Sequence, residues 1–409
     1  PKTPKPHEHP FIIIINKEMQ RQAAVQGKQT LTHLQAYTAA RSAPLAFVEA
    51  PRRFYELQRL HVYDQGGRNS LSGINATLFG ASSALGVATA SSLGRIGSTV
   101  VLPHRKMAGS WENRFKEIKT TVDLGYKSYL KLQDFTNEHE LQFAMQNSNV
   151  AISCVGSHVF YKKEADFEEA NIRVPMAIAK AVRDSPHIKR FIYVSAAGAD
   201  PNSQSKRLRT KYIGEQEVKA ICPDVTILRP TYMVNNNDPN KTIAAKWGMH
   251  MKMFNRMNWT VQGMDAKVQP VYVNDVSLAI LNCLKMEESI GQTYELGGPH
   301  VYTYEEIYRM FFDITQIKPY TASVKLEDVY YYYHLKWWQS FYRQMFRTWL
   351  SPEFMTIESQ ELLVRPDALT FEDLHIKPIS FGAKAHELVN DVYWLYNAHT
   401  VTRRENANN

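Results

Sequence analysis

The chain has 409 residues, which is enough for one large domain with extensions or for two domains. Hydrophobic residues make up 44% of the sequence and charged residues 22%, a balance that supports a packed core and excludes a wholly disordered chain. The formal net charge of +8 is not gathered in long basic blocks. It suits an anionic cofactor, an anionic membrane surface or a mitochondrial protein, and does not by itself indicate nucleic acid.

The three cysteines, Cys154, Cys222 and Cys283, are widely separated, so the sequence predicts no disulfide framework and a reducing compartment. No metal site is predicted. The longest apolar run, Phe11 to Ile15, is too short for a membrane-spanning helix. The chain begins with Pro1 rather than Met, which is compatible with N-terminal processing and with a targeting segment upstream.

Residues 1–71 form a distinct N-terminal extension. Four of the first ten residues are proline, which argues against regular structure there. The extension carries ten Lys and Arg against five Asp and Glu, so most of the net charge lies here. Two interpretations remain open, namely an extension that lies on a partner and a disordered basic tail.

The next stretch predicts a strand over Ile74–Phe79, a turn of small residues over Gly80–Ser83, a helix, and a second strand over Thr99–Leu102. This is the spacing of a dinucleotide-binding βαβ unit. Gly80 permits a turn that a Cβ would obstruct, Gly86 allows close helix packing, and the helix N-terminus favours a pyrophosphate. Ser83 occupies the usual place of the middle glycine, so an ordinary strand–turn–helix remains the alternative.

Residues 72–300 show alternating strand and helix signals and are predicted to form the Rossmann-like, NADPH-binding domain. Further strands are predicted over Tyr129–Leu132, Val150–Val155, Phe191–Val194 and Val225–Leu228, and further helices over Glu138–Met145, Phe167–Val182 and Arg207–Ala220. Six strands with intervening helices predict an α/β fold with a Rossmann-like, doubly wound parallel sheet. The carboxyl ends of the strands are expected to line one crevice.

The end of the second predicted strand indicates which dinucleotide is bound. NAD-selective sites place a carboxylate there, whereas this chain has His104, Arg105 and Lys106 and no acid. Arg105 can grip a 2′-phosphate bidentately, with His104 or Lys106 adding charge. The sequence therefore favours NADPH over NADH, with a solvated surface arginine as the alternative.

The fold so far resembles an extended or atypical short-chain dehydrogenase/reductase. That family uses a Tyr-x-x-x-Lys pair after the fifth strand, and Lys211 matches the lysine. Arg207 stands at the tyrosine position and stays protonated near pH 7, while Tyr212 lies on a different helix face. We therefore predict no dehydrogenase activity. Lys211 is expected to contact the nicotinamide ribose, with a surface lysine as the alternative.

Further motifs narrow the resemblance to one family. They lie at 72–81, 93–98, 103–105, 123–125, 148–150, 178–179, 189–195, 208–215 and, most specifically, Gln269-Pro270-Val271-Tyr272-Val273 with Asp275-Val276-Ser277. The chain resembles the NADPH-binding, atypical short-chain dehydrogenase-like accessory subunits of mitochondrial respiratory complex I. The resemblance covers residues 72–300, continues weakly to Ile376 and excludes residues 1–71.

The resemblance implies a tightly held, structural NADPH and no catalysis. It also implies a place on the matrix side of the mitochondrial inner membrane, among complex I subunits near the junction of the matrix and membrane arms. The expected cofactor-binding residues are Gly80, Ala81, Ser82, Ser83, Ala84, Leu85, Gly86, His104, Arg105, Asp134, Val155, Gly156, Ser195, Lys211 and Pro230.

Two other functions stay open. One is an active NADPH-dependent short-chain reductase or epimerase, which would need a tyrosine from elsewhere, such as Tyr161 or Tyr232, in the crevice. The other is a scaffold with an empty crevice.

Residues 301–409 form the third predicted region, after 1–71 and 72–300, and are expected to be mostly helical. Aromatic residues between 338 and 349 recur at helical spacing, with basic residues opposite. This stripe suits lipid head groups, a membrane subunit or a partner helix, and packing on its own domain is the alternative. No stacking motif supports RNA binding.

Overall fold

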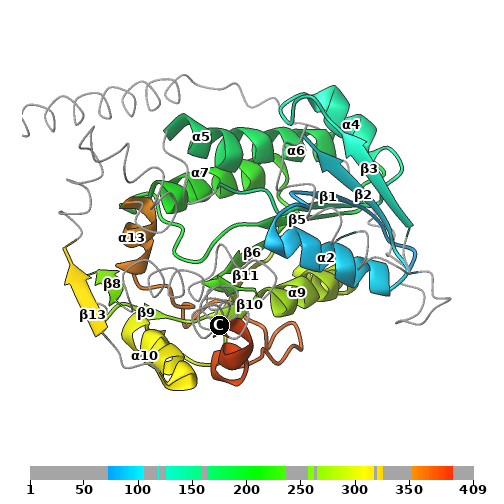
Figure 1. Cartoon of the computed structure of the whole chain (residues 1–409). Coiled ribbons are helices and arrows are strands. Elements are labelled where there is room, and N and C mark those ends of the chain that lie inside the picture. The colour runs from blue at the N-terminus through cyan, green and yellow to red at the C-terminus, as the bar shows by residue number, and fades with distance from the viewer. Residues whose placement is uncertain are drawn as a thin grey trace, which may run out of the picture. The chain divides into compact units, whose positions relative to one another are not determined.

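The computed structural model describes residues 72–105, 118, 126–157, 164–235, 257–261, 265–316, 320–325 and 352–389. All of them fall within the unit Gln58–Asn409. The largest sheet among these residues has seven strands in the order β11-β6-β5-β4-β1-β2-β3, and every neighbouring pair is parallel (Figure 1). The strands are β1 (Asn75–Phe79), β2 (Thr99–His104), β3 (Tyr126–Lys131), β4 (Val150–Ser153), β5 (Arg190–Val194), β6 (Thr226–Pro230) and β11 (Thr293–Leu296).

This strand order is that of a Rossmann sheet with one more strand at the β6 edge. The direction of winding reverses between β1 and β4, which creates a switch point at their carboxyl ends. The predicted α/β, doubly wound fold is therefore confirmed, and each of the six predicted strands is present.

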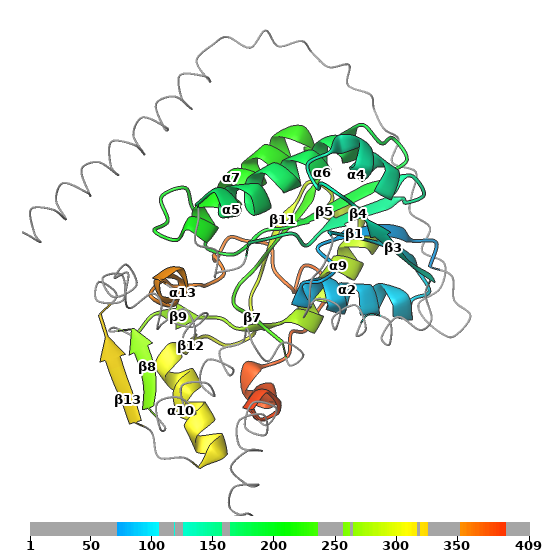
Figure 2. The same cartoon turned by 45° about the horizontal axis from the view of Figure 1, so that its top comes forward.

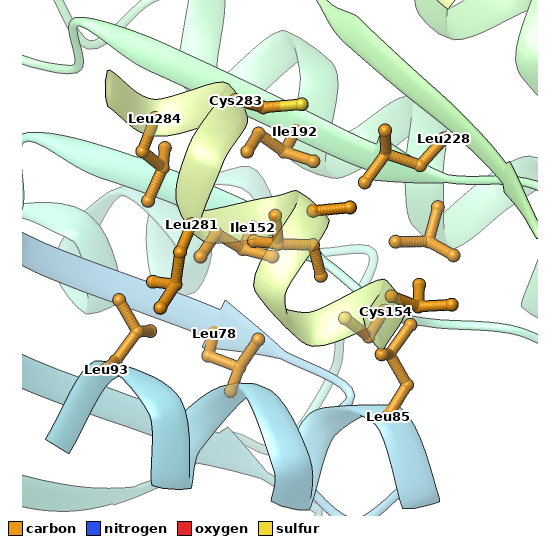
Figure 3. Packing of buried hydrophobic residues seen from close by; sticks show 14 of the residues in the cluster. Leu78, Leu85, Leu93, Ile152, Cys154, Ile192, Leu228, Leu281, Cys283 and Leu284 are labelled. Atoms are coloured by element: carbon orange, nitrogen blue, oxygen red, sulfur yellow. The ribbon is translucent and has the colours of Figure 1, made fainter. Parts of the chain in front are cut away.

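Helices cover both faces of the sheet. Helices α2 and α9 lie on one face, and α4, α5, α6 and α7 lie on the other (Figures 1 and 2). Their bounds are α2 (Ala84–Arg95), α4 (Glu138–Met145), α5 (Glu164–Glu168), α6 (Val174–Arg183), α7 (Lys206–Ile221) and α9 (Val273–Lys285). Leu85 and Leu93 of α2 and Leu281 of α9 pack over Leu78 and Ile152 of the sheet (Figure 3).

Strand β2 is longer than the predicted Thr99–Leu102. The strand runs to His104 and pairs with β3 up to that residue. The backbone nitrogen of Pro103 is on the side of β2 that faces β1. The pairing of β1 with β2 ends at Val101, before this proline. The missing N–H of Pro103 therefore removes no ladder hydrogen bond.

The bounds of β3 and β4 also differ from prediction. Strand β3 begins at Tyr126, three residues earlier than expected, and ends at Lys131. Strand β4 ends at Ser153, although the apolar run continues to Val155. The last two residues of that run form part of the site described below.

The strand β11 was not predicted, since Glu295 interrupts its apolar pattern. Glu295 is buried and accepts hydrogen bonds from Arg229 of β6 (3.1 Å) and from Arg365 (2.8 Å). Paired in this way, the carboxylate is compatible with a buried strand. Sequence periodicity cannot show such partners.

The helix predicted over Phe167–Val182 contains a π-helical turn. Residues Glu169–Arg173 form this turn (η1) between α5 and α6, and Pro175 lies at the start of α6, where its missing N–H is tolerated. Asn171, at the centre of the turn, is fully buried. Single π turns inside helices are frequent at functional sites.

The remaining described elements are short. They are β7 (Met233–Val234), β8 (Met257–Val261), β9 (Lys267–Val268), β10 (Val271–Tyr272), η2 (Glu287–Ser289), β12 (Tyr302–Thr303), α10 (Tyr304–Thr315), β13 (Tyr320–Val324) and α13 (Pro352–Glu358). Residues 381–389 are also helical. Thus the region after residue 300 contains strands as well as the predicted helices. No helix within the described ranges has both the length and the apolar character to cross a bilayer.

Two predictions concern residues outside these ranges. They are the basic N-terminal extension over 1–71 and the aromatic stripe over 338–349. The boundary at residue 300 stays a prediction, although Phe371, Leu374 and Ile376 belong to the same core cluster as Leu78.

Candidate functional site

The turn between β1 and α2 has a backbone that only glycine accommodates. Gly80 adopts φ +79°, and a Cβ added there would lie 2.7 Å from the backbone carbonyl of Cys154. The turn of β1 and the end of β4 thus touch at the switch point. This geometry confirms the role in the turn predicted for Gly80.

Helix α2 packs tightly against the same turn. A Cβ on Gly86 would lie 2.3 Å from the carbonyl oxygen of Gly80, so the close approach predicted for Gly86 is to the turn. Ser83 is the N-cap of α2, and its hydroxyl accepts the backbone N–H of Gly86 at 2.9 Å. Of the other predicted residues here, Ala81 and Leu85 are buried, whereas Ser82 and Ala84 are half-buried.

At the end of β2, the side chain of Arg105 is 60% exposed. Its guanidinium lies 3.4 Å from a carboxylate oxygen of Glu169 and 5.8 Å from the ring centroid of Phe135. Asp134, after β3, is exposed and accepts hydrogen bonds from the backbone and hydroxyl of Thr136. These bonds, with the charge of Arg105 adding to them, lower the pKa of Asp134. His104 directs Nδ1 toward the carbonyl of Arg105 at 3.0 Å.

Lys211 is buried, with 3% of its surface exposed, so the alternative of a surface lysine is wrong. Its Nζ donates to the carbonyls of Val155 (2.9 Å) and Val194 (3.0 Å), at the carboxyl ends of β4 and β5. Burial, reinforced by the positive charge of Arg207, lowers the pKa of Lys211 to about 7. An amine that titrates near neutral pH thus lies where the crevice was predicted.

Gly156 lies beside this amine, and Asn171 lies on the other side of Gly156. Gly156 is exposed, and a Cβ there would lie 3.2 Å from Nζ of Lys211. Asn171 accepts the backbone N–H of Ser157 and donates to the hydroxyls of Ser157 (2.9 Å) and Thr210 (2.8 Å). Asn171 was not predicted, although an asparagine on the apolar side of a predicted amphipathic helix was a signal.

Ser195 and Pro230 end the neighbouring strands. Ser195 is buried, and its hydroxyl has no hydrogen-bond partner among the described residues. Pro230 contributes its carbonyl, which accepts the N–H of Ala197 at 2.9 Å. A buried hydroxyl without a protein partner beside a strand end is consistent with a ligand at this edge.

Arg207 lies in the first turn of α7, one turn before Lys211, as predicted. It is half-buried, and burial lowers the pKa of its guanidinium, while the carboxylate of Glu353 opposes this effect. Tyr232 is close enough to Arg207 to influence it electrostatically, and its ring lies 6.4 Å from that of Tyr304. Tyr161 lies outside the described residues.

The turn, Arg105 and Lys211 together could hold a dinucleotide along the carboxyl edge of the sheet. Gly80 and Gly86 place no side chain where the dinucleotide would lie. The start of α2 provides backbone N–H groups, and Lys211 provides a hydrogen-bond donor near the switch point. Within the described ranges, no group of three or more His, Cys, Asp or Glu residues could hold a metal ion.

Solved structures confirm the fold. The chain superposes on UDP-glucuronic acid 4-epimerase from Bacillus cereus, in complex with UDP-glucuronic acid and NAD, with a TM-score of 0.60 and 14% identity. The superposition covers 79% of this chain and all of the epimerase chain. At this identity the likeness concerns the fold alone.

Curated relatives include several mitochondrial proteins. The chain is 36% identical over 262 residues to NADH dehydrogenase (ubiquinone) 1 alpha subcomplex subunit 9 of Arabidopsis thaliana, which corresponds to 64% of this chain and 62% of the relative. The match spans 62% to 64% of the length of this relative and its rat and mouse counterparts.

A second curated relative matches over a longer stretch. The chain is 32% identical over 329 residues to the mitochondrial NADH-ubiquinone oxidoreductase 40 kDa subunit of Neurospora crassa, covering 78% of this chain and 79% of that subunit. No protein-family model matches the sequence. The resemblance predicted from the motifs is confirmed, and the chain belongs to the family of the mitochondrial NADH-ubiquinone oxidoreductase 40 kDa subunit, or alpha subcomplex subunit 9.

Proposed function

We propose that this chain is a non-catalytic accessory subunit of mitochondrial NADH:ubiquinone oxidoreductase (complex I) that holds a structural NADPH. The observation that carries the proposal is the joint position of the Gly80 turn and Lys211 at the switch point of the sheet. The names of its relatives support membership of complex I. The same names support a mitochondrial location, which we extend to the matrix side of the inner membrane.

Three parts of the site would bind three parts of the cofactor. The pyrophosphate would lie on the turn 80–86, where the N-terminus of α2 favours an anion. The adenosine 2′-phosphate would meet Arg105, near Asp134 and Phe135. The nicotinamide ribose would meet Lys211, beside Gly156 and Ser195.

Arg105 favours the phosphorylated dinucleotide. Its guanidinium is exposed at the end of β2, and solvent weakens its ion pair with Glu169, at 3.4 Å. A 2′-phosphate offers a stronger, bidentate partner.

A bound NADPH carries a nicotinamide that can donate hydride, but the chain offers no matching proton donor at the expected position. Arg207 replaces the tyrosine, and even with its pKa lowered by burial a guanidinium does not exchange a proton near neutral pH. Lys211 donates two of its hydrogens to backbone carbonyls. Holding the cofactor then stabilises the folded subunit by mass action.

The proposed partners are complex I subunits of the matrix arm and of its junction with the membrane arm. Contact with a membrane subunit or with lipid head groups belongs to the same proposal and rests on the aromatic stripe in the sequence. Nucleic acid is not a proposed partner.

One observation favours a second candidate, an NADPH-dependent reductase or epimerase. Tyr232 follows the end of β6 and lies near Arg207, so its hydroxyl could take the place of the missing tyrosine. Incubation of the purified chain with NADPH and a panel of carbonyl substrates distinguishes the two. If the chain oxidises NADPH with one of these substrates, and Tyr232→Phe abolishes this activity, the chain is an enzyme and the structural proposal is wrong.

The direct test of the structural proposal is isolation of the chain under native conditions. Gently solubilised mitochondrial membranes should yield the chain in the large NADH-oxidising complex. Recovery of the chain only outside that complex would overturn the accessory-subunit role. Mass spectrometry of nucleotide released from the isolated chain should detect NADPH, and the absence of any dinucleotide would support the scaffold with an empty crevice instead.

A further inference from the structure

The first turn of α7 is capped by a carboxylate from the C-terminal region. Glu353 of α13 is 9% exposed, and its Oε1 accepts the hydroxyl of Ser205 and the backbone N–H of Arg207 (2.9 Å). Its Oε2 accepts the backbone N–H of Lys206 at 3.2 Å. The free N–H groups at the start of α7 are thus satisfied from a segment almost 150 residues away in sequence.

A second set of contacts joins α7 to the C-terminal region, and it begins one turn after Lys211. Glu215 is buried and pairs with Arg229 of β6, with 3.0 Å between its Oε2 and the arginine Nε. Arg229 pairs with Glu295 of β11 at 3.1 Å. Glu295 in turn accepts the backbone N–H (3.0 Å) and the Nε (2.8 Å) of Arg365. This chain of charges also ends in the C-terminal segment.

Lys211 lies between these two connections on a single helix. Positions 207 and 215 are one turn before and one turn after it, so each neighbours Lys211 on the helix surface. Their charges act on its amine in opposite senses, since Arg207 lowers its pKa and Glu215 raises it. Cys154, after β4, and the Tyr193 ring of β5 also face the amine. Residues that contact both flanks of a helix fix its rotation and translation, and therefore the position of Nζ.

We propose that the C-terminal segment 353–365 holds α7 in place for cofactor binding, with Glu353 as a positioning residue for Lys211. This inference rests on the proposed NADPH site and adds a form of regulation to it. Binding of the dinucleotide and seating of the segment favour one another, because a coupling free energy between two sites is reciprocal. A partner that displaces or secures this segment then changes how tightly the cofactor is held.

The test compares NADPH titrations of the full chain between pH 6 and 9. Glu353→Gln should weaken binding by about fivefold at pH 7.5. The pH at which affinity begins to fall should also move downward, because Arg207 then acts on Lys211 without its counter-charge. Glu361→Gln, an exposed glutamate of the same segment, is the matched control and should behave as the wild type. With Lys211→Met present, Glu353→Gln should have no further effect on affinity.

Equal affinity and equal pH midpoint for wild type and Glu353→Gln would overturn the inference and leave the NADPH site standing. A wild-type chain that binds no NADPH would instead overturn the proposed function. Should Glu353→Gln fail to fold, hydrogen exchange on the wild type decides. NADPH should protect residues 352–365 more than residues 282–292, at the opposite end of the sheet, and equal protection of both would contradict the coupling.

Discussion

At the scale of single residues, Lys211 explains most about the site. An ammonium group has three hydrogens, and the carbonyls of Val155 and Val194 take two of them. Only the protonated form keeps a third hydrogen for a ribose hydroxyl, together with a charge that favours an anionic ligand. The neutral amine has no hydrogen left to offer.

The pH dependence of binding follows from this count. The pKa of Lys211 is about 7 in the free protein, and a bound dinucleotide should raise it. At pH values between the pKa of Lys211 in the free protein and its pKa in the complex, the complex holds a proton that the free protein lacks. Affinity therefore falls as the pH rises above about 7, by up to about tenfold per pH unit. Titrations at several pH values should show this slope in the wild type and none in Lys211→Met. A slope retained in Lys211→Met would assign the titration to another group.

Arg105 is the residue that we propose selects the phosphorylated dinucleotide. Arg105→Ala should weaken NADPH binding about tenfold, because it removes a charge-assisted pair, and should leave NADH binding nearly unchanged. Calorimetric titration with both nucleotides measures the ratio. Arg95→Ala, at the exposed end of α2, is the control. Equal losses of affinity for NADPH and NADH would show that Arg105 does not bind the 2′-phosphate.

At the scale of elements, the β1–α2 turn should be sensitive to a single methyl group. Gly80→Ala forces a left-handed backbone onto alanine and places its Cβ against the backbone of Cys154, so it should destabilise the fold by about 2 kcal/mol or more. Gly156→Ala brings no backbone clash, because its Cβ would lie nearest to the end of the Lys211 side chain, at 3.2 Å, so it should cost less stability than Gly80→Ala and should weaken NADPH binding. Urea unfolding and nucleotide titration separate the two effects. Equal stability losses would contradict this assignment.

Periodicity predicted the elements that bury apolar residues in a regular pattern. Strands β1, β4 and β5 are short apolar runs, and α4 ends where predicted, at Met145. Strand β11 and the π turn escaped prediction because their buried polar residues, Glu295 and Asn171, depend on partners far away in sequence. Sequence spacing carries no information about such partners.

The parts of the candidate site that are formed by residues close together in sequence could be predicted. The turn 80–86 and the Arg207–Lys211 spacing each lie within a few consecutive residues, so motif spacing was enough to find them. Glu353, which contacts the start of α7 from the C-terminal region, lies outside any motif. The burial of Lys211 likewise follows from the packing of α7 on the sheet and not from its neighbours in sequence.

At the scale of the whole molecule, the C-terminal region and the sheet share one core. Leu374 is fully buried in the cluster that contains Leu78 and Ile152. Leu374→Ala should therefore cost about 2 to 5 kcal/mol, through the cavity it leaves, and shift the single unfolding transition of the chain. Leu278→Ala, on the exposed face of α9, should change stability by less than about 0.5 kcal/mol. Thermal unfolding that reveals a separate, early transition for Leu374→Ala would indicate that the region folds independently.

The central claim is that this chain holds NADPH as part of complex I. The most direct measurement is the nucleotide content of the complex isolated from mitochondria that carry either the wild-type chain or Arg105→Ala. The account predicts about one NADPH per wild-type chain within the NADH-oxidising complex, and a large loss of NADPH with Arg105→Ala. A wild-type complex that contains the chain but no NADPH would contradict it.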